Sequence, residues 1–290
     1  VVTPSWANKE VKTHADEKGC WELQITTPAA SFEEYTLTLT DGEQSVTLQH
    51  LLIGEVWLCA GQSNMVMPLN GFDYCPISDS NNVIADAPNH PGIRMVTIKP
   101  TVKLSPQEYA EGSWQQPTTE NAPKFSAAAY HYALTLQRTL QIPIGVITCA
   151  WGGSRVEGWL PKEILQTYKD EDLTLIGSDK TPVYLQSMLM YNGILYPCHK
   201  YTIKGFIWYQ GESNVRSSRT YAERLATMVK HWRSIWKQGD LPFYYVETVP
   251  FACEYKEDGY IGALLREAQQ KALSLIPNSG MIGTNDLVET

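Results

Sequence analysis

Residues 54–65 read GEVWLCAGQSNM, and they set the arrangement of the whole chain. The apolar run Val56 to Ala60 is typical of a short strand buried in a core. The run ends at Gly61, and Ser63 follows directly beyond the strand end. An acyl-transfer enzyme holds its nucleophilic serine at such a position. A helix N-cap is the alternative interpretation, because the apolar residues after Ser63 can open a helix.

Strands alternate with helices along the rest of the chain. Apolar runs predict further strands at 93–98, 144–150, 205–210, 243–249 and 281–284, several of them apolar throughout, as strands buried on both faces are. Apolar residues at helical spacing predict helices at 125–140, 183–195, 219–237 and 262–275. This alternation predicts an α/β fold with a doubly wound parallel sheet. We expect the long polar loops 70–92 and 99–122 to frame a binding cleft.

Residues 1–52 follow a different pattern. Apolar and polar residues alternate at 21–25, 35–40 and 46–48, and Asp41-Gly42 is a turn signal. The pattern predicts a small antiparallel β unit with too few strands for a complete domain. We therefore expect a partial N-terminal β-rich segment over 1–52 and the main domain over 53–290.

The composition excludes several classes of function. The net charge is −8 and the basic residues do not cluster, so nucleic acid is not an expected partner. The longest apolar run, 142–151, is too short to span a membrane, and the first residues lack the charged start and apolar core of a signal peptide. None of the six cysteines forms a Cys-x-x-Cys motif, so we expect no metal site. A disulfide between Cys75 and Cys198 is compatible with the sequence, which leaves the pairing and the oligomeric state open.

Three polar or Gly-rich segments follow predicted strands: GQSN at 61–64, WGGSR at 151–155 and QGESN at 210–214. The carboxyl ends of parallel strands meet at one edge of a sheet, so the three segments should converge there. Attack on an ester carbonyl creates an oxyanion that needs preoriented N–H donors. The backbone N–H groups of Gly153 and Ser63 fit this need, together with the side-chain amide of Gln210 or Asn214. Either amide is equally compatible with a satisfied structural role in the loop.

These motifs resemble those of the sialate O-acetylesterase family within the SGNH hydrolases. The resemblance rests on GEVWL before GQSNM, on WYQGESN at 208–214, on WGGS and VEGW within 151–159, and on YNG at 191–193. It runs from about Gly19 to the end of the chain. It implies a three-layer α/β/α sandwich in which Ser63 is the nucleophile. Gly153 and an amide side chain are then the oxyanion donors, and we favour Gln210 over Asn214.

The resemblance implies a serine-dependent carbohydrate O-acetylesterase that acts on sialic acids or related sugars without a cofactor. The expected partner is the acetylated carbohydrate, and the expected compartment is secreted, periplasmic or lysosomal in type. An acetylxylan-type esterase and a catalytically silent carbohydrate-binding relative are the alternatives, and a serine peptidase is a weaker one. Arg155 is a possible substrate-binding residue for a sialic acid carboxylate. A structural ion pair of Arg155 with Glu157 or another acid is the interpretation that we favour.

The catalytic acid and base depart from the family pattern. In the family an Asp and a His follow the last strand, whereas here that strand leads into Asn285-Asp286 and the chain stops at Thr290. No histidine follows His231. His199 is the other candidate, but it precedes strand 205–210 and should lie at the opposite sheet edge from Ser63. We expect the base beyond Thr290, and we expect a chain that ends there to be a poor catalyst.

Overall fold

The computed structural model describes residues 1–7, 9–250 and 260–286 of the chain. Six parallel strands form its central sheet in the order β5-β6-β4-β7-β8-β9. Their bounds are β4 Glu55–Gly61, β5 Ile93–Thr97, β6 Ile144–Ala150, β7 Gly205–Tyr209, β8 Phe243–Val246 and β9 Ser279–Ile282. Every strand predicted for the main domain is present, and the doubly wound α/β fold is confirmed.

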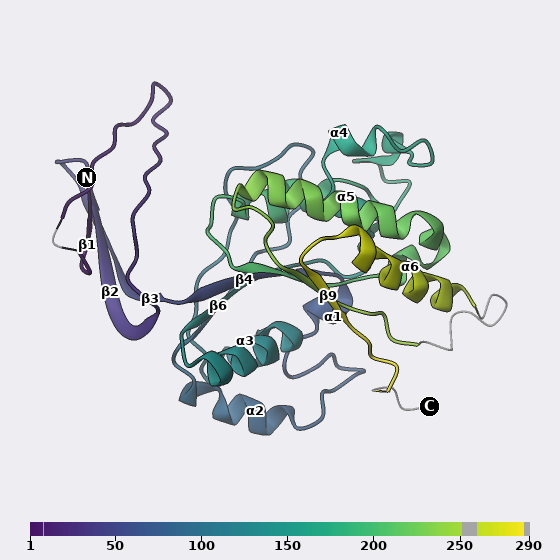
Figure 1. Cartoon of the computed structure of the whole chain (residues 1–290), viewed down its shortest axis with the longest axis horizontal. Helices are drawn as coiled ribbons and strands as arrows, with labels where there is room; N and C mark the ends of the chain where they lie inside the picture. The colour runs from purple at the N-terminus through teal and green to yellow at the C-terminus, as the bar shows by residue number, and fades with distance from the viewer. Residues whose placement is uncertain (8, 251–259, 287–290) are drawn as a thin grey trace.

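Helices cover both faces of this sheet, which gives three layers (Figure 1). On one face lie α1 (Ser63–Val66), α2 (Ser80–Asp86) and α3 (Ala127–Leu140), and on the other lie α4 (Lys162–Leu165), α5 (Ser218–Trp236) and α6 (Ile261–Leu275). Alternate residues of β4 enter two separate cores. Leu58 and Ala60 join the core under α5, whereas Trp57 and Cys59 join the core under α3. The apolar run at 56–60 is therefore buried on both sides, as the sequence predicts.

The order of the strands reverses at β4. The chain adds β5 and β6 on one side of it and β7, β8 and β9 on the other. In an open α/β sheet such a switch point opens a crevice beyond the strand ends, where ligands bind. Gly61 pairs with Ala150 of β6 and with Tyr209 of β7, so the three strands end level. Only glycine fits here, because a Cβ on Gly61 would lie 2.1 Å from the carbonyl oxygen of Tyr209.

The predicted helix at 183–195 is wrong. Short 3₁₀ turns at Val183–Leu185 and Tyr196–Cys198 flank a π-helical turn at Tyr191–Leu195. Met188 between them has a φ of +72°, a left-handed conformation that no α-helix continues through. The segment is apolar because it is buried on several sides, and its apolar residues therefore do not mark one buried face of a helix. Conversely, the sequence pattern missed a helix, because α2 forms inside loop 70–92.

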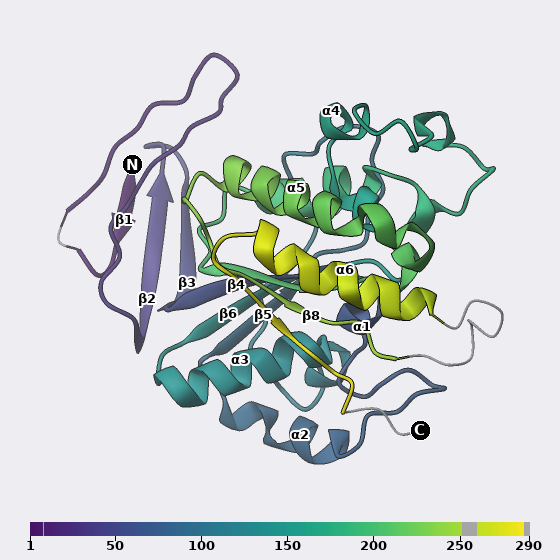
Figure 2. The ribbon, with the colours of Figure 1, turned by 45° about the vertical axis from the view of Figure 1, so that its right-hand side comes forward.

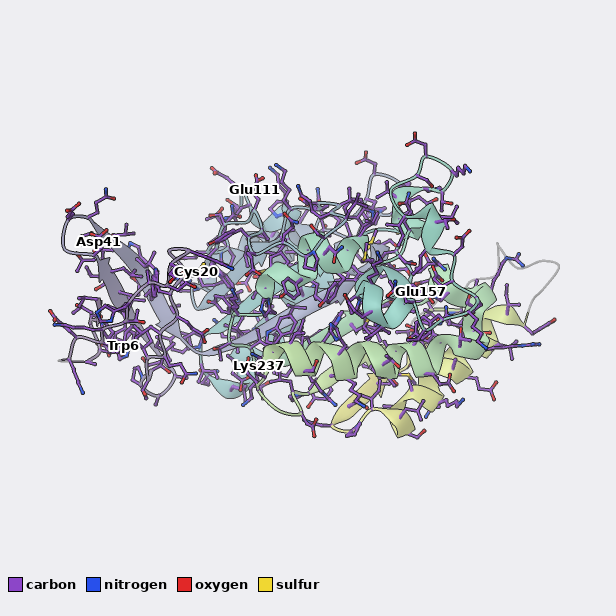
Figure 3. The ribbon with its side chains drawn as sticks, turned by 90° about the horizontal axis from the view of Figure 1, so that it is seen from above. Trp6, Cys20, Asp41, Glu111, Glu157 and Lys237 are labelled. Atoms are coloured by element: carbon purple, nitrogen blue, oxygen red, sulfur yellow. The ribbon has the colours of Figure 1, made fainter. Side chains whose placement is uncertain are left out.

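The N-terminal residues form a separate antiparallel sheet of β1 (Val2–Pro4), β2 (Ser31–Thr40) and β3 (Ser45–Ile53). It projects from the body in Figures 1 and 2, and Figure 3 shows Trp6 and Asp41 within it at the end of the molecule away from Glu157. The turn signal is confirmed, because Asp41 Oδ1 accepts hydrogen bonds from the N–H groups of the next turn residues, Glu43 and Gln44. The predicted strand at 21–25 is wrong, since that segment joins no ladder.

The cysteine contacts differ from the pairing left open by the sequence. Cys198 is buried with its Sγ 3.9 Å from Sγ of Cys149, whereas Cys75 is exposed. All five described cysteines are free thiols, and Cys253 lies outside the described residues. Within the same described part of the chain, no helix has the length and apolarity needed to cross a membrane.

Candidate active site

Ser63 is the first residue of α1, immediately beyond the carboxyl end of β4. The N-cap interpretation is wrong, because the cap position is Gln62 and no side chain caps the helix. The Oγ of Ser63 makes no hydrogen bond with any other described residue, and the residue is half-buried. The N–H groups of Ser63 and Asn64 belong to the first helical turn and have no intrahelical acceptor. Among the described residues, the Ser63 hydroxyl and these two N–H groups at the sheet edge therefore have no hydrogen-bond partner.

The loop after β7 is bound to this serine turn. Gln62 Oε1 accepts hydrogen bonds from the N–H groups of Gly211 at 3.2 Å and Ser213 at 3.4 Å. Asn64 Nδ2 donates to Glu212 Oε1 at 2.8 Å. The sequence pattern alone is typical of a solvated loop glutamate, but Glu212 is half-buried against the residue that follows Ser63. The residues flanking the serine thus hold the 210–214 segment in place.

The loop after β6 completes the edge. Trp151 N–H donates to the Gly61 carbonyl at 3.0 Å, and Ser213 Oγ donates to the Gly153 carbonyl at 2.8 Å. Gly153 has a φ of +74°, which favours glycine. Its N–H has no acceptor among the described residues. The structure therefore brings Ser63, Gly153 and segment 210–214 together, and it leaves the Gly153 donor available.

The two candidate amides are both deeply buried, and both are hydrogen-bonded to protein groups. Gln210 Nε2 donates to Ser154 O at 3.0 Å and to Asn214 Oδ1 at 2.8 Å, and its Oε1 accepts from Tyr221 at 2.9 Å. Asn214 Oδ1 also accepts from Val156 N–H, at 2.9 Å. A primary amide has two N–H donors, and both donors of Gln210 are used. These contacts favour a role for Gln210 in positioning the Gly153 loop.

Arg155 lies behind this loop in a cluster of charges. Its guanidinium pairs with Glu171 at 2.6 Å and with Glu157 at 3.8 Å, and it donates twice to the carbonyl of Leu185. The contacts favour the structural ion pair over the binding of a substrate carboxylate, because most of the donors of Arg155 have protein acceptors.

Glu157 is the centre of that cluster and is fully buried. It accepts from Arg224 at 2.6 Å and from Asn214 Nδ2 at 3.0 Å. Burial alone would lower the pKa of Arg224, but the hydrogen bond to Glu157 and the nearby carboxylates outweigh it, and the net pKa is raised. The charge of Arg224 thus holds Glu157 in place, and the hydrogen bond to Glu157 holds Asn214 and, through Asn214, Gln210.

The sequence model described as "Carbohydrate esterase, sialic acid-specific acetylesterase" matches residues 53–290. The chain belongs to this family. Curated relatives named sialate O-acetylesterase from Pongo abelii and Homo sapiens are each 26% identical over 94% of the chain. The chain spans 54% of the length of both, about half of each relative.

A solved structure supports the same relationship. A carbohydrate acetylesterase from Xanthomonas citri is 30% identical and superposes with a TM-score of 0.84 over 97% of this chain and 61% of its own. An Arabidopsis thaliana protein at 18% identity and a TM-score of 0.51, over 81% of this chain and 87% of its own, shares the fold. The fold of the chain is thus the SGNH-type sandwich of this esterase family.

No histidine among the described residues hydrogen-bonds to Ser63. His199 Nδ1 lies 2.6 Å from the carbonyl oxygen of Tyr196, and His231 Nε2 lies 2.8 Å from the hydroxyl of Tyr191. The segment after β9 is tied to the carboxyl edge instead, because Asn285 Nδ2 donates to Glu247 Oε2 at 2.8 Å. In both views α1 and the end of β9 lie at this edge (Figures 1 and 2). The described chain after β9 therefore lies at the same edge as the serine.

A cavity of about 400 Å³ adjoins the Gly153 loop. Ser213, which holds the Gly153 carbonyl, forms part of its wall. The rest of the wall combines the polar residues Arg155, Glu171, Gln186 and Ser187 with the apolar residues Leu175, Ile176 and Leu185. Hydroxyl, amide and charged groups of this kind can exchange hydrogen bonds with the hydroxyls of a sugar.

Proposed function

We propose that the chain is the catalytic part of a carbohydrate O-acetylesterase whose nucleophile is Ser63. The observation that carries the proposal is that the hydroxyl of Ser63 and the N–H of Gly153 both lie at the switch point of the sheet. Neither group has a hydrogen-bond partner among the described residues. Membership of the esterase family supports the same chemistry. In this proposal residues 53–290 form the hydrolase domain, and residues 1–52 are a β-rich segment that precedes it.

The reaction takes two steps. Ser63 Oγ attacks the acetyl carbonyl, and the negative charge that develops on the carbonyl oxygen accepts hydrogen bonds from the N–H groups of Gly153 and Ser63. A base takes the serine proton and passes it to the sugar oxygen as the bond between that oxygen and the acetyl carbon breaks, so the sugar leaves as an alcohol. Water then gives a proton to the same base and attacks the acetylated serine, which releases acetate and returns the proton to Ser63 Oγ. A serine hydroxyl needs a base within hydrogen-bond reach, and we assign that base to a histidine beyond Thr290. The hydrogen bond of Asn285 to Glu247 at the carboxyl edge supports this assignment, because it brings the last described residues to the edge that holds Ser63.

The amides and Arg155 have supporting roles in this proposal. Gln210 holds Ser154, which is adjacent to the oxyanion donor, and Asn214 anchors Gln210 to the buried Glu157. For Gln210 to act as an oxyanion donor, one of its two internal bonds would have to be exchanged for a bond to the substrate. Arg155 secures the backbone of Leu185 on the neighbouring loop.

The substrate that we propose is an O-acetylated sialic acid, because two relatives bear the name sialate O-acetylesterase. We propose a secreted, periplasmic or lysosomal-type compartment on the same resemblance. The test compares acetate release by the full-length protein from an O-acetylated sialic acid and from acetylated xylo-oligosaccharides at equal concentration. Faster release from the sialic acid is expected.

Two other results would replace the proposal with a specific alternative. A clear preference for the xylo-oligosaccharides would identify an acetylxylan-type esterase. Saturable binding of both sugars with no acetate release from either would identify a silent carbohydrate-binding relative. The Ser63→Ala variant is the control, because it should retain sugar binding and lose acetate release.

A further inference from the structure

An exposed aromatic ring packs against the oxyanion loop. Tyr184 belongs to the 3₁₀ turn Val183–Leu185 and keeps 41% of its surface exposed. A Cβ on Gly153 would lie 2.7 Å from Cδ2 of this ring and 3.2 Å from Cγ and Cε2. The ring therefore rests on the bare Cα of Gly153, beside the N–H that we assign to the oxyanion. No described residue hydrogen-bonds to its hydroxyl group.

The loop that carries Tyr184 is rigidly held. Arg155 donates from Nε and Nη2 to the carbonyl of Leu185, at 3.0 and 2.9 Å. The buried amide of Gln186 closes the loop, since its Nε2 donates to the carbonyls of Ser178 at 2.9 Å and Thr181 at 2.8 Å. An aromatic side chain has few rotatable bonds, so on a fixed backbone it loses little entropy when it binds a ligand. Such a ring is a preorganised contact surface.

The surroundings of the ring identify the chemistry that it would contact. The residues directly after it, Leu185, Gln186 and Ser187, line the cavity of about 400 Å³, whose wall has both polar and apolar groups. A pyranose presents C–H groups on its faces and hydroxyls around its edge. The C–H face packs on the electron-rich face of an aromatic ring, and the hydroxyls find polar partners in the adjoining cavity. A flat ring beside hydrogen-bonding groups thus matches a sugar better than a purely apolar acyl chain.

We propose that Tyr184 is a substrate-binding residue that stacks on the sugar ring while its acetyl ester lies at Ser63. The inference rests on the proposed function and adds to it the residue that recognises the carbohydrate part. In this arrangement Arg155 is a positioning residue, because it fixes the backbone next to Tyr184. The energy of stacking is used to place the ester next to the Gly153 donor, so its loss should reduce kcat/KM for sugar esters selectively.

The test compares two esters in the full-length protein. One is the acetylated sugar that the wild type hydrolyses faster, and the other is ethyl acetate, whose alcohol has no ring to stack. The measured quantity is the ratio of kcat/KM for the sugar ester to kcat/KM for ethyl acetate. Tyr184→Ala and Tyr184→Leu should each lower this ratio about tenfold. A tenfold change corresponds to the typical free energy of one aromatic contact. Tyr184→Phe should keep the ratio, because it keeps the ring.

The leucine variant separates recognition from structural support. Leucine still covers Gly153 with apolar bulk, so a purely structural role would leave its ratio at the wild-type value. That result, or an unchanged ratio in Tyr184→Ala, would overturn the inference. Tyr244→Ala is the matched control, since Tyr244 of β8 is 41% exposed like Tyr184 and its ring stacks on Trp57, near the amino end of β4. A wild type that cleaves ethyl acetate but no acetylated sugar would overturn the proposed function itself, and the inference with it.

Discussion

Replacing Gln210 by alanine distinguishes a scaffold residue from an oxyanion donor. The change removes three hydrogen bonds inside a site that solvent does not reach. Two of the three partners keep another bond, because Asn214 Oδ1 still accepts from Val156 and Tyr221 still donates to the carbonyl of residue 210. The carbonyl of Ser154 loses its side-chain donor. Loss of the three bonds, with one acceptor left unsatisfied, should lower the free energy of unfolding by about 2–4 kcal/mol.

The assay is urea unfolding at neutral pH, followed by tryptophan fluorescence, together with kcat on 4-nitrophenyl acetate. Gln137→Ala is the matched control, since Gln137 is a buried glutamine on α3 that makes no side-chain hydrogen bond within the described chain. It should cost less than about 1.5 kcal/mol, as substitutions without a lost polar partner usually do. The positioning role predicts that Gln210→Ala loses both stability and turnover. If Gln210→Ala unfolds at the same urea midpoint as the wild type but loses kcat by about 10²–10³, the positioning role is refuted and Gln210 is an oxyanion donor.

The remaining predictions concern the Gly153 loop and the pH dependence of stability. Gly153→Ala should lower kcat sharply in steady-state assays, because its Cβ would press on the Tyr184 ring and a left-handed residue costs about 1–2 kcal/mol. Gly152→Ala should retain wild-type kcat, since a Cβ there meets no atom within 4 Å; equal losses in both variants would contradict the oxyanion assignment. Burial lowers the pKa of His231 and of His131, so the unfolded chain binds more protons and the free energy of unfolding should fall as the pH drops below about 6.5. Unfolding curves of His231→Gln between pH 7.5 and 5.5 should show a shallower slope than the wild type, and an unchanged slope would refute that contribution.

The central sheet could be predicted because its strands are local apolar runs. Val56 to Ala60 and 144–150 are buried on both faces, so periodicity alone indicates them. Convergence of Ser63, Gly153 and segment 210–214 follows from topology, since parallel strands end at one edge. Local sequence carried enough information for these features.

Other features depend on distant partners that no local pattern encodes. Residues 183–195 have helical spacing, yet the left-handed Met188 interrupts them, and Gly193 packs so closely that a Cβ would lie 2.0 Å from Thr101 O. The engagement of Gln210 depends on Ser154, 56 positions earlier in the chain. Residues 21–25 alternate like a strand but lack a neighbouring strand to pair with. Tertiary contacts decide these cases, and periodicity cannot supply them.

Covalent labelling with a fluorophosphonate tests the assignment of Ser63 most directly. The reagent phosphonylates activated serine hydroxyls with loss of fluoride, and mass spectrometry of the full-length protein locates the adduct. We expect one phosphonyl group per chain on the peptide that contains Ser63, none in Ser63→Ala, and normal labelling in Ser234→Ala, whose serine is exposed on α5. An adduct that persists in Ser63→Ala, or that maps to another serine in the wild type, would show that Ser63 is not the nucleophile.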